Sequence, residues 1–90
     1  MTDKKLLWDE WNKEHIKKHG VTIVEIEEVW RSKTIEYDSY LERKVILGKT
    51  KDERLLTIII SVTNDQRYYV ISSRDMSKKE RRIYYDSQKK

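Results

Sequence analysis

The sequence predicts an α+β fold, in which two N-terminal helices precede a small antiparallel sheet of three to four strands and a C-terminal helix. Three observations predict it. Helix start and stop signals fill the first third of the chain, β-branched runs between turn residues fill the middle, and a capping motif opens a charged run near the end. With 90 residues, no internal repeat and no Pro-rich or Gly-rich linker, we expect a single domain over residues 1–90.

The first helix is predicted from both of its ends. Asp9 is a typical N-cap residue, and Gly20 is typical of the position that stops a helix. Trp11, His15 and His19 recur every four residues, which is the spacing of one helical face. We therefore expect a helix over residues 10–19.

A second helix follows at once. Thr22 and Glu25 have the spacing of a capping box, which predicts a helix over residues 22–31. Residues 32–42 carry weak signals and are expected to form a loop. Residues 6–8 either form a short strand or pack on the core.

The sheet and the last helix occupy the rest of the chain. Leu55 to Val62 is nearly all apolar and β-branched, which is typical of a central strand buried on both faces. Ser77 and Glu80 have the spacing of another capping box. The predicted strands span residues 43–49, 54–63 and 67–73, and the predicted helix spans residues 77–87.

Several classes of protein are excluded or disfavoured. The chain has no Cys, which excludes disulfide and thiolate chemistry and fits a reducing compartment. The N-terminus lacks the apolar stretch of a signal peptide, and the longest apolar run is too short to cross a bilayer. Only two glycines are present, too few for a glycine-rich phosphate loop. We expect a cytoplasmic protein that does not bind membranes.

A metal site is also disfavoured. His15 and His19 stand four residues apart and would share one side of a helix, but a third ligand is not evident and the His-Glu-x-x-His order is missing. We prefer the interpretation that His15 packs on the helix face and that His19 closes the helix end. We expect neither a metal nor another cofactor.

The charge distribution indicates a polyanionic or acidic partner. The net charge is +4, and acidic residues gather in the first half of the chain, whereas Lys and Arg dominate from Arg74 to Lys90. Cleavage of RNA requires no metal, because the substrate carries its own nucleophile, the 2′-hydroxyl. A protein then has to position the phosphate, handle a proton and stabilise the charge that develops.

Candidate residues for such a site lie at predicted strand ends and helix termini. Arg74 follows the third strand, although it could instead pair with an acid of the first helices. Arg54 lies in a charged turn where solvation is the simpler interpretation, and His19 could cap its helix. Tyrosines near these positions, including Tyr84, could stack on unpaired bases. The further cationic candidates for RNA binding are Lys49, Arg67, Lys78 and Arg81.

Two stretches resemble a known family. The first runs from Trp8-Asp9 to Lys18-His19-Gly20-Val21, and the second contains Ile71-Ser72-Ser73-Arg74 followed by Lys79-Glu80-Arg81 and Tyr84. Together, and in this order, they resemble the BrnT family of type II toxin–antitoxin systems, which has Trp-Asp, Lys-His-Gly-Val, Ile-Ser-Ala-Arg, Arg/Lys-Glu-Arg and Tyr. His15 and Ser73 depart from the common pattern, which is typical of a divergent branch.

The resemblance implies a RelE-like ribonuclease fold, metal-independent RNA cleavage and a ribbon-helix-helix antitoxin as partner, in a hetero-oligomer. By position, it implies a catalytic set of Arg74, Arg54, His19 and Glu80. Arg54 and Arg74 would hold the scissile phosphate, and His19 or Glu80 would assist proton transfer. Arg81 and Tyr84 match the last motif.

Two other hypotheses remain open from the sequence. The chain could be a catalytically inactive module of the same fold that binds RNA or a partner protein through its basic helix. It could also be a structural partner whose sheet is covered by an antitoxin.

Overall fold

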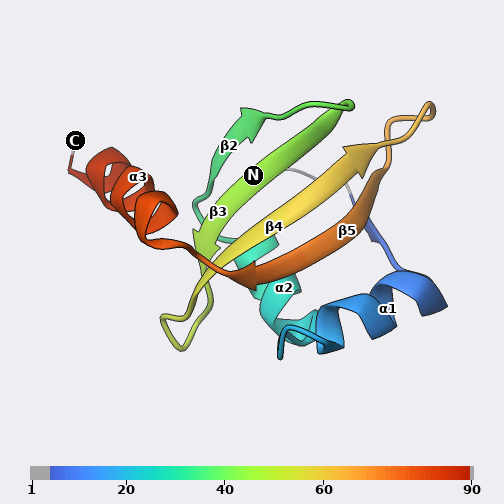
Figure 1. The fold of residues 1–90 in the computed structure, drawn as a ribbon, viewed down its shortest axis with the longest axis horizontal. Helices are drawn as coiled ribbons and strands as arrows, with labels where there is room; N and C mark the ends of the chain where they lie inside the picture. Colours follow the sequence, from blue (N-terminus) through green and yellow to red (C-terminus); the bar gives the residue numbers. More distant parts are fainter. Residues whose placement is uncertain (1–4, 90) are drawn as a thin grey trace.

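The computed structural model describes residues 5–89, which form three helices and one five-stranded sheet. This confirms the α+β class with helices at both ends, although the sheet has five strands instead of three to four. In chain order the elements are β1 (Leu6–Leu7), α1 (Glu10–Lys17), α2 (Ile23–Trp30), β2 (Ile35–Asp38), β3 (Arg43–Lys49), β4 (Leu55–Val62), β5 (Tyr68–Asp75) and α3 (Lys78–Gln88) (Figure 1). No helix among these residues is long and apolar enough to cross a membrane.

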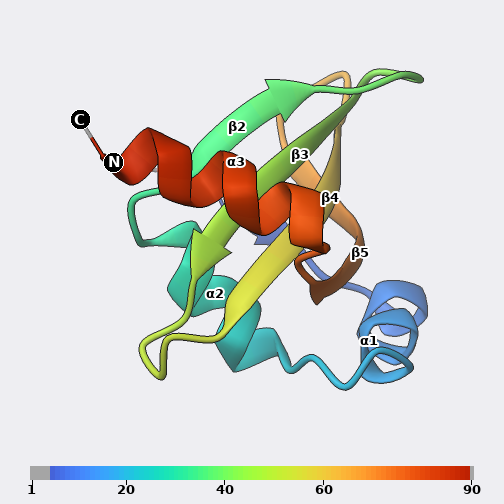
Figure 2. The same cartoon turned by 60° about the vertical axis from the view of Figure 1, so that its left-hand side comes forward.

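The sheet separates two hydrophobic cores. Its strand order is β1-β5-β4-β3-β2, with β1 parallel to β5 and all other neighbours antiparallel. Helices α1 and α2 cover one face (Figure 1), and α3 crosses the other face near β3 (Figure 2). The larger core includes Ile16, Ile26 and Ile58, and the smaller one includes Leu47 and Tyr84. Because α3 is short and lies at one end of the sheet, much of the sheet face on which it packs carries no helix.

Side chains cap the helices as the sequence signals indicate. Asp9 caps α1 and accepts a hydrogen bond from the backbone N–H of Asn12, whose side chain accepts one from the Asp9 N–H. Thr22 and Glu25 form the same reciprocal pair at the start of α2. Gly20 has a φ of 69°, the left-handed conformation expected where a helix is stopped. These local bonds satisfy N–H groups that the first helical turns leave without partners.

The face of α1 that packs on the sheet lies beside the row of Trp11, His15 and His19. Ile16 and Asn12 are fully buried, whereas the Trp11 side is exposed. Asn12 Nδ2 donates to the carbonyls of Leu7 and Val70, which ties α1 to both β1 and β5. Trp11 instead stacks on His15 in solvent, with ring centroids 4.7 Å apart. The helix also ends at Lys17, so that residues 18–20 form the turn.

The loop expected over residues 32–42 was wrong, because strand β2 lies within it. Ile35 pairs with Leu47 and Asp38 pairs with Lys44, so β2 completes the edge of the sheet. Its sequence, Ile-Glu-Tyr-Asp, is mostly polar and exposed, as suits an edge strand. Pairing with β3 determines its conformation, and the short alternation of Ile35 and Tyr37 is a weak local signal for it. Residues 6–7 form the short strand β1 on the opposite edge.

We predict that Gly48→Ala destabilises the fold through a clash with one side chain. A Cβ at Gly48 would lie 2.6 Å from Cγ1 of the fully buried Val29, closer than real contacts permit. We expect a loss of about 1–3 kcal/mol in the free energy of unfolding. Val29→Ala should relieve the clash, so a double-mutant cycle by urea denaturation should show a favourable coupling of about 1 kcal/mol or more.

Gly20→Ala is the matched control for that cycle. A Cβ at Gly20 meets nothing within 4 Å, and its cost arises from the positive φ alone. Its effect should therefore add to that of Val29→Ala without coupling. Additive losses in the Gly48 cycle would contradict the close approach of α2 to β3.

Candidate functional site

A β-bulge in β5 directs Arg74 onto the open face of the sheet. Ile59 pairs with Ser72 whereas the next residue, Ile60, pairs with Val70, so Ile71 is an extra residue in β5. Without it, strict alternation would place Arg74 on the same face as Val70, which is fully buried under the helices. With it, Arg74 and its partner Thr57 lie on the α3 face. Bulges commonly re-aim side chains in this way beside functional sites.

Arg74 and Glu80 form the centre of the candidate site. Arg74 Nη1 and Nη2 donate to the two carboxylate oxygens of Glu80 over 2.7 and 3.0 Å, which is a bidentate pair. Glu80 also accepts hydrogen bonds from Thr57 Oγ1 and from the backbone N–H of Ser77, each at 2.8 Å. The Glu80 side chain is 13% exposed and that of Arg74 is 41% exposed. The guanidinium is thus fixed from the protein side and open to solvent on the other.

The surroundings of Glu80 make it an anchor for Arg74 and a poor proton acceptor. Burial alone would raise the pKa of Glu80, but the bonds from Arg74, Ser77 and Thr57 outweigh it and lower that pKa to about 2. A carboxylate with so low a pKa is a weak base near neutral pH. The role in proton transfer predicted for Glu80 is therefore not favoured, whereas a role in positioning Arg74 is.

Tyr37 of β2 lies on the same face of the sheet, because it pairs with Val45 of the smaller core, and it was not among the site residues predicted from the sequence. Partial burial raises the pKa of Tyr37, and the nearby negative charge of Glu80 raises it further, while Arg74 opposes the shift. Its phenol therefore stays protonated near neutral pH and can donate a proton or a hydrogen bond. The alternation of Ile35 and Tyr37 was the available signal, and it was obscured by the expectation of a loop.

Arg54 lies on the helix-covered side of the sheet end, away from the face that presents Arg74. Its Nε donates to Asp75 at 2.8 Å, and its Nη1 donates to the Gly20 carbonyl and to Glu25 at 2.9 and 3.0 Å. Asp75 follows Arg74 in β5 and its side chain takes the opposite face. The hydrogen bonds to Asp75 and Glu25 raise the pKa of Arg54 despite some burial. Arg54 therefore joins the helices to the sheet, and the two arginines do not converge on one phosphate.

His19 does not join this cluster either. It follows α1, on the covered side of the sheet, and its ring meets the ring of His15 edge-on at 5.8 Å. Within residues 5–89, no group of three or more His, Asp or Glu side chains is arranged to hold a metal ion.

The residues predicted to bind RNA are divided among several places. Lys78 and Arg81 lie on the first turns of α3, next to Arg74, and Arg81 donates to the Met76 carbonyl. Arg67 immediately precedes β5, at the end opposite Arg74 and about 23 Å along the strand from it, and pairs with Asp65. Lys49 ends β3 and lines a separate hollow. Tyr84 is only 5% exposed and packs in the smaller core, so its ring offers no free face to a base.

These features define a small α+β protein with an arginine–carboxylate site on an open sheet face. A family model for BrnT, the ribonuclease toxin of type II toxin–antitoxin systems, matches residues 8–80. The chain therefore belongs to the BrnT family, which confirms the resemblance seen in its motifs. The match includes Arg54, Arg74 and Glu80. Comparisons with the curated proteins and with the solved structures gave no match.

We predict that Glu80 makes the fold sensitive to acid. Its pKa lies near 2 in the folded protein and near its ordinary 4.5 in the unfolded chain, so its ionised form stabilises the fold above about pH 4.5. That contribution, roughly 2–3 kcal/mol, should be lost as the pH falls from 4.5 toward 2. Urea denaturation across this range should therefore show a steeper loss of stability in the wild type than in Glu80→Gln.

The exposed Glu14→Gln is the control, because Glu14 pairs only with Lys17 on the surface of α1. Its stability should follow the wild-type curve through the same range. A Glu80→Gln variant with the full acid sensitivity of the wild type would mean that other carboxylates, such as Glu25 and Asp75, account for it.

Proposed function

We propose that this chain is a toxin of a type II toxin–antitoxin system that cleaves RNA without a metal ion. The single observation that supports this most is Arg74, which Glu80 holds rigidly with its outer side open to solvent. A fixed guanidinium aimed at an open face suits a phosphate whose charge increases during the reaction. The BrnT family is one of ribonuclease toxins, and the geometry supports the residue roles that we propose.

The reaction needs few groups from the protein. The RNA 2′-oxygen attacks the adjacent phosphorus and gives its proton to solvent water, while the bond from phosphorus to the 5′-oxygen breaks and that oxygen gains a proton from the protein. The products are a 2′,3′-cyclic phosphate and a 5′-hydroxyl. The protein contributes by aligning the attack, by stabilising the phosphorane and by protonating the leaving group.

In this proposal Arg74 stabilises the phosphorane. Its position is rigid because both of its Nη atoms are bonded to Glu80, so little reorganisation is needed as charge develops. Glu80 also accepts hydrogen bonds from Ser77 and Thr57, so its negative charge is shared among three donors and offsets the charge of Arg74 less. Lys78 and Arg81 at the start of α3, where the helix dipole is positive, add attraction for the RNA backbone.

Tyr37 protonates the 5′-oxygen in the same proposal. Its phenol is protonated at neutral pH, and it lies on the sheet face of the smaller core, the face that also carries Arg74 and Glu80. Tyr37 takes the place of His19 and Glu80 as the proton donor, because His19 lies on the other side of the sheet and Glu80, with its pKa near 2, is ionised.

The partner in this proposal is a cognate antitoxin, for which we retain the ribbon-helix-helix fold and a toxin–antitoxin hetero-oligomer. The sheet face that carries Arg74 has no helix over β4 and β5 (Figure 1). Tyr40 and Leu41, in the turn after β2, are 75% and 71% exposed. Exposed apolar side chains beside an open sheet are typical of a surface that a partner covers.

We predict that Arg74→Ala greatly slows cleavage of a single-stranded RNA in the presence of chelator. Loss of one charge-stabilising donor is worth about 2–4 kcal/mol, so the rate should fall roughly 30- to 1,000-fold. Arg67→Ala, which removes an equal charge at the far end of β5, should retain activity. Gel analysis of defined RNA with quantified cyclic-phosphate ends provides the measurement.

Because Arg74→Ala leaves Glu80 without its main partner, a second variant separates catalysis from folding. Arg74→Ala/Glu80→Gln removes the unpaired carboxylate and should be folded by circular dichroism yet inactive. If the wild type cleaves no RNA under any condition but binds it, the alternative applies, namely a catalytically inactive RNA-binding or partner-binding module. If the folded double variant cleaves like the wild type, Arg74 has no part in catalysis.

We predict that Tyr37→Phe slows cleavage about 100-fold with little change in KM, because the ring keeps its packing while the proton donor is lost. An RNA with a sulfur atom in place of the scissile 5′-oxygen needs no proton on its leaving group. That substrate should be cleaved equally by the wild type and by Tyr37→Phe. Tyr40→Phe, an exposed neighbour, is the control, and an equal defect of Tyr37→Phe on both substrates would exclude the acid role.

A further inference from the structure

Two adjacent hollows wrap around the end of the sheet between α2, β2 and α3. The first, of about 520 Å³, lies beyond the end of α2 and is lined by Trp30, Tyr68 and Glu36 among others. The second, of about 440 Å³, lies between the end of α2, the β3–β4 turn and the second half of α3. They share Arg31, Ser32 and Lys33 as a common wall. We call the two hollows together the basic groove.

The cations of the basic groove are not neutralised by the protein. Lys33, Lys49 and Lys51 form no ion pair with any described residue, and Arg31 makes only a long contact of 3.8 Å to Glu27. The two carboxylates in the lining are already engaged. Glu36 is paired with Lys44 at 3.6 Å, and Glu28 accepts the backbone N–H of Lys51 at 3.2 Å. The groove therefore presents an excess of positive charge from three separate segments.

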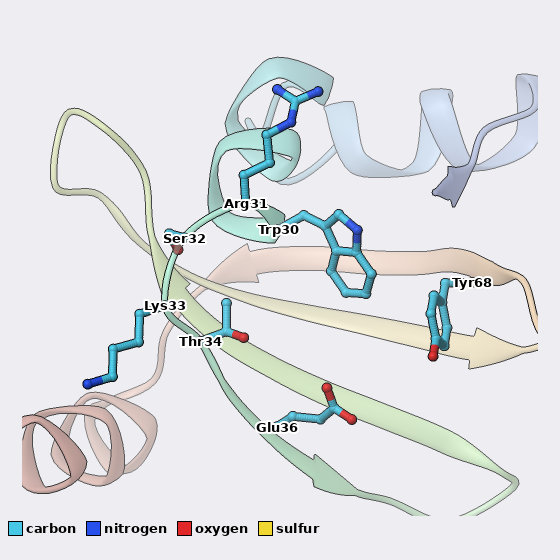
Figure 3. A pocket seen from close by; sticks show the side chains of 7 residues that line it. All are labelled: Trp30, Arg31, Ser32, Lys33, Thr34, Glu36 and Tyr68. Atoms are coloured by element: carbon cyan, nitrogen blue, oxygen red, sulfur yellow. The ribbon is translucent and has the colours of Figure 1, made fainter. Parts of the chain in front are cut away.

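Aromatic rings lie at one end of the basic groove. The rings of Trp30 and Tyr68 meet edge-to-face with centroids 5.4 Å apart, and both side chains are half-buried. Figure 3 shows the two rings directed into the first hollow, whereas Lys33 extends away from it toward α3. Rings next to unpaired cations are the combination with which proteins bind single-stranded nucleic acid, since bases stack on the rings and phosphates contact the cations.

The second hollow and the Arg74 site both border α3. Glu80, which holds Arg74, lies on the first turn of α3, and Tyr84 and Gln88, which line the second hollow, follow one and two turns later. At the rise of an α-helix, Tyr84 is only about 6 Å along the axis from Glu80. An RNA strand that leaves the Arg74 site along α3 would reach the lysines of the groove directly.

We propose that the basic groove is a second RNA-binding site, which holds the single-stranded segment flanking the scissile phosphate. Phosphates contact Arg31, Lys33 and Lys51, and an unpaired base enters the hollow at Trp30 and Tyr68. This inference rests on the proposed function for the identity of the strand. A protein partner with an acidic segment is the competing occupant, and the aromatic end of the groove favours RNA.

The test is the salt dependence of binding to a short 2′-O-methyl RNA, which binds but cannot be cleaved because its nucleophile is blocked. Fluorescence anisotropy compares the wild type with Arg31→Gln/Lys33→Gln/Lys51→Gln. Loss of three phosphate contacts should lower the slope of log Kd against log salt by about 2 and weaken binding at low salt at least about tenfold. All three side chains are exposed, so the fold should be retained.

The matched control is Lys13→Gln/Lys17→Gln/Lys18→Gln, which removes the same charge from α1. It should leave both the slope and the affinity near the wild-type values. Nuclear magnetic resonance gives a second measurement, because the indole N–H signal of Trp30 should shift on addition of RNA while that of the exposed Trp11 does not. Because the chain has three Trp residues, assignment uses Trp11→Phe and Trp8→Phe, and the signal present in both spectra is that of Trp30.

Equal losses in the two triple variants would mean that only net charge matters, which overturns the groove. A groove variant that binds RNA normally but no longer binds the antitoxin would assign this surface to the protein partner instead, and absence of RNA binding by the wild type would also overturn the inference. Cleavage of unmodified RNA is measured separately. If the groove variant binds RNA more weakly but the wild type does not cleave RNA, this inference stands and the proposed function is refuted. If the wild type cleaves RNA and the groove variant binds RNA as well as the wild type does, the proposed function stands and this inference is refuted.

Discussion

The carboxylate of Glu80 is the interaction on which the arrangement of this face depends. It accepts bonds from Thr57 on β4, Arg74 on β5 and the backbone N–H of Ser77 at the start of α3. A carboxylate that is 13% exposed is costly to fold without such partners, so the three elements have to come together as a unit. The same carboxylate therefore caps α3, sets the direction in which the helix leaves the sheet and holds the guanidinium of Arg74. The Glu80 carboxylate therefore serves both the local fold and the candidate site.

That arrangement also needs the extra residue in β5. The bulge at Ile71 changes which side chains of β5 point toward the helices, so that Val70 and Ser73 are both buried while Arg74 points to the open face. Ser73 Oγ donates to the Thr57 carbonyl at 3.0 Å, which gives the buried hydroxyl a partner. A strand with strict alternation would place the charge of Arg74 in the apolar core beneath α2, at a large energetic cost. The bulge is therefore a requirement of the site and of the core at the same time.

The sequence reveals those parts of the structure that depend on near neighbours. The helix starts at Asp9 and Thr22, with partners three residues later, follow from capping chemistry that any such segment has. Strand β2 and the bulge do not, because both exist only through pairing with β3 and β4. The site was affected accordingly. Arg74 and Glu80 were identified from motifs, whereas Tyr37 was missed because its strand was not expected.

Arg54 and Arg74 show why a motif match does not by itself assign a role. Both arginines lie within the residues that the family model matches, yet Arg54 is bonded to Asp75, to Glu25 and to the Gly20 carbonyl on the helix side. There it holds α2 and the α1–α2 turn against the sheet. Arg74 has a single carboxylate partner and faces solvent. The adjacent residue Asp75 separates the two, because consecutive residues of a strand face opposite sides. Arg54 thus fixes the scaffold through Asp75 at the end of β5. Arg74, the residue before Asp75, faces the phosphate that we propose it binds.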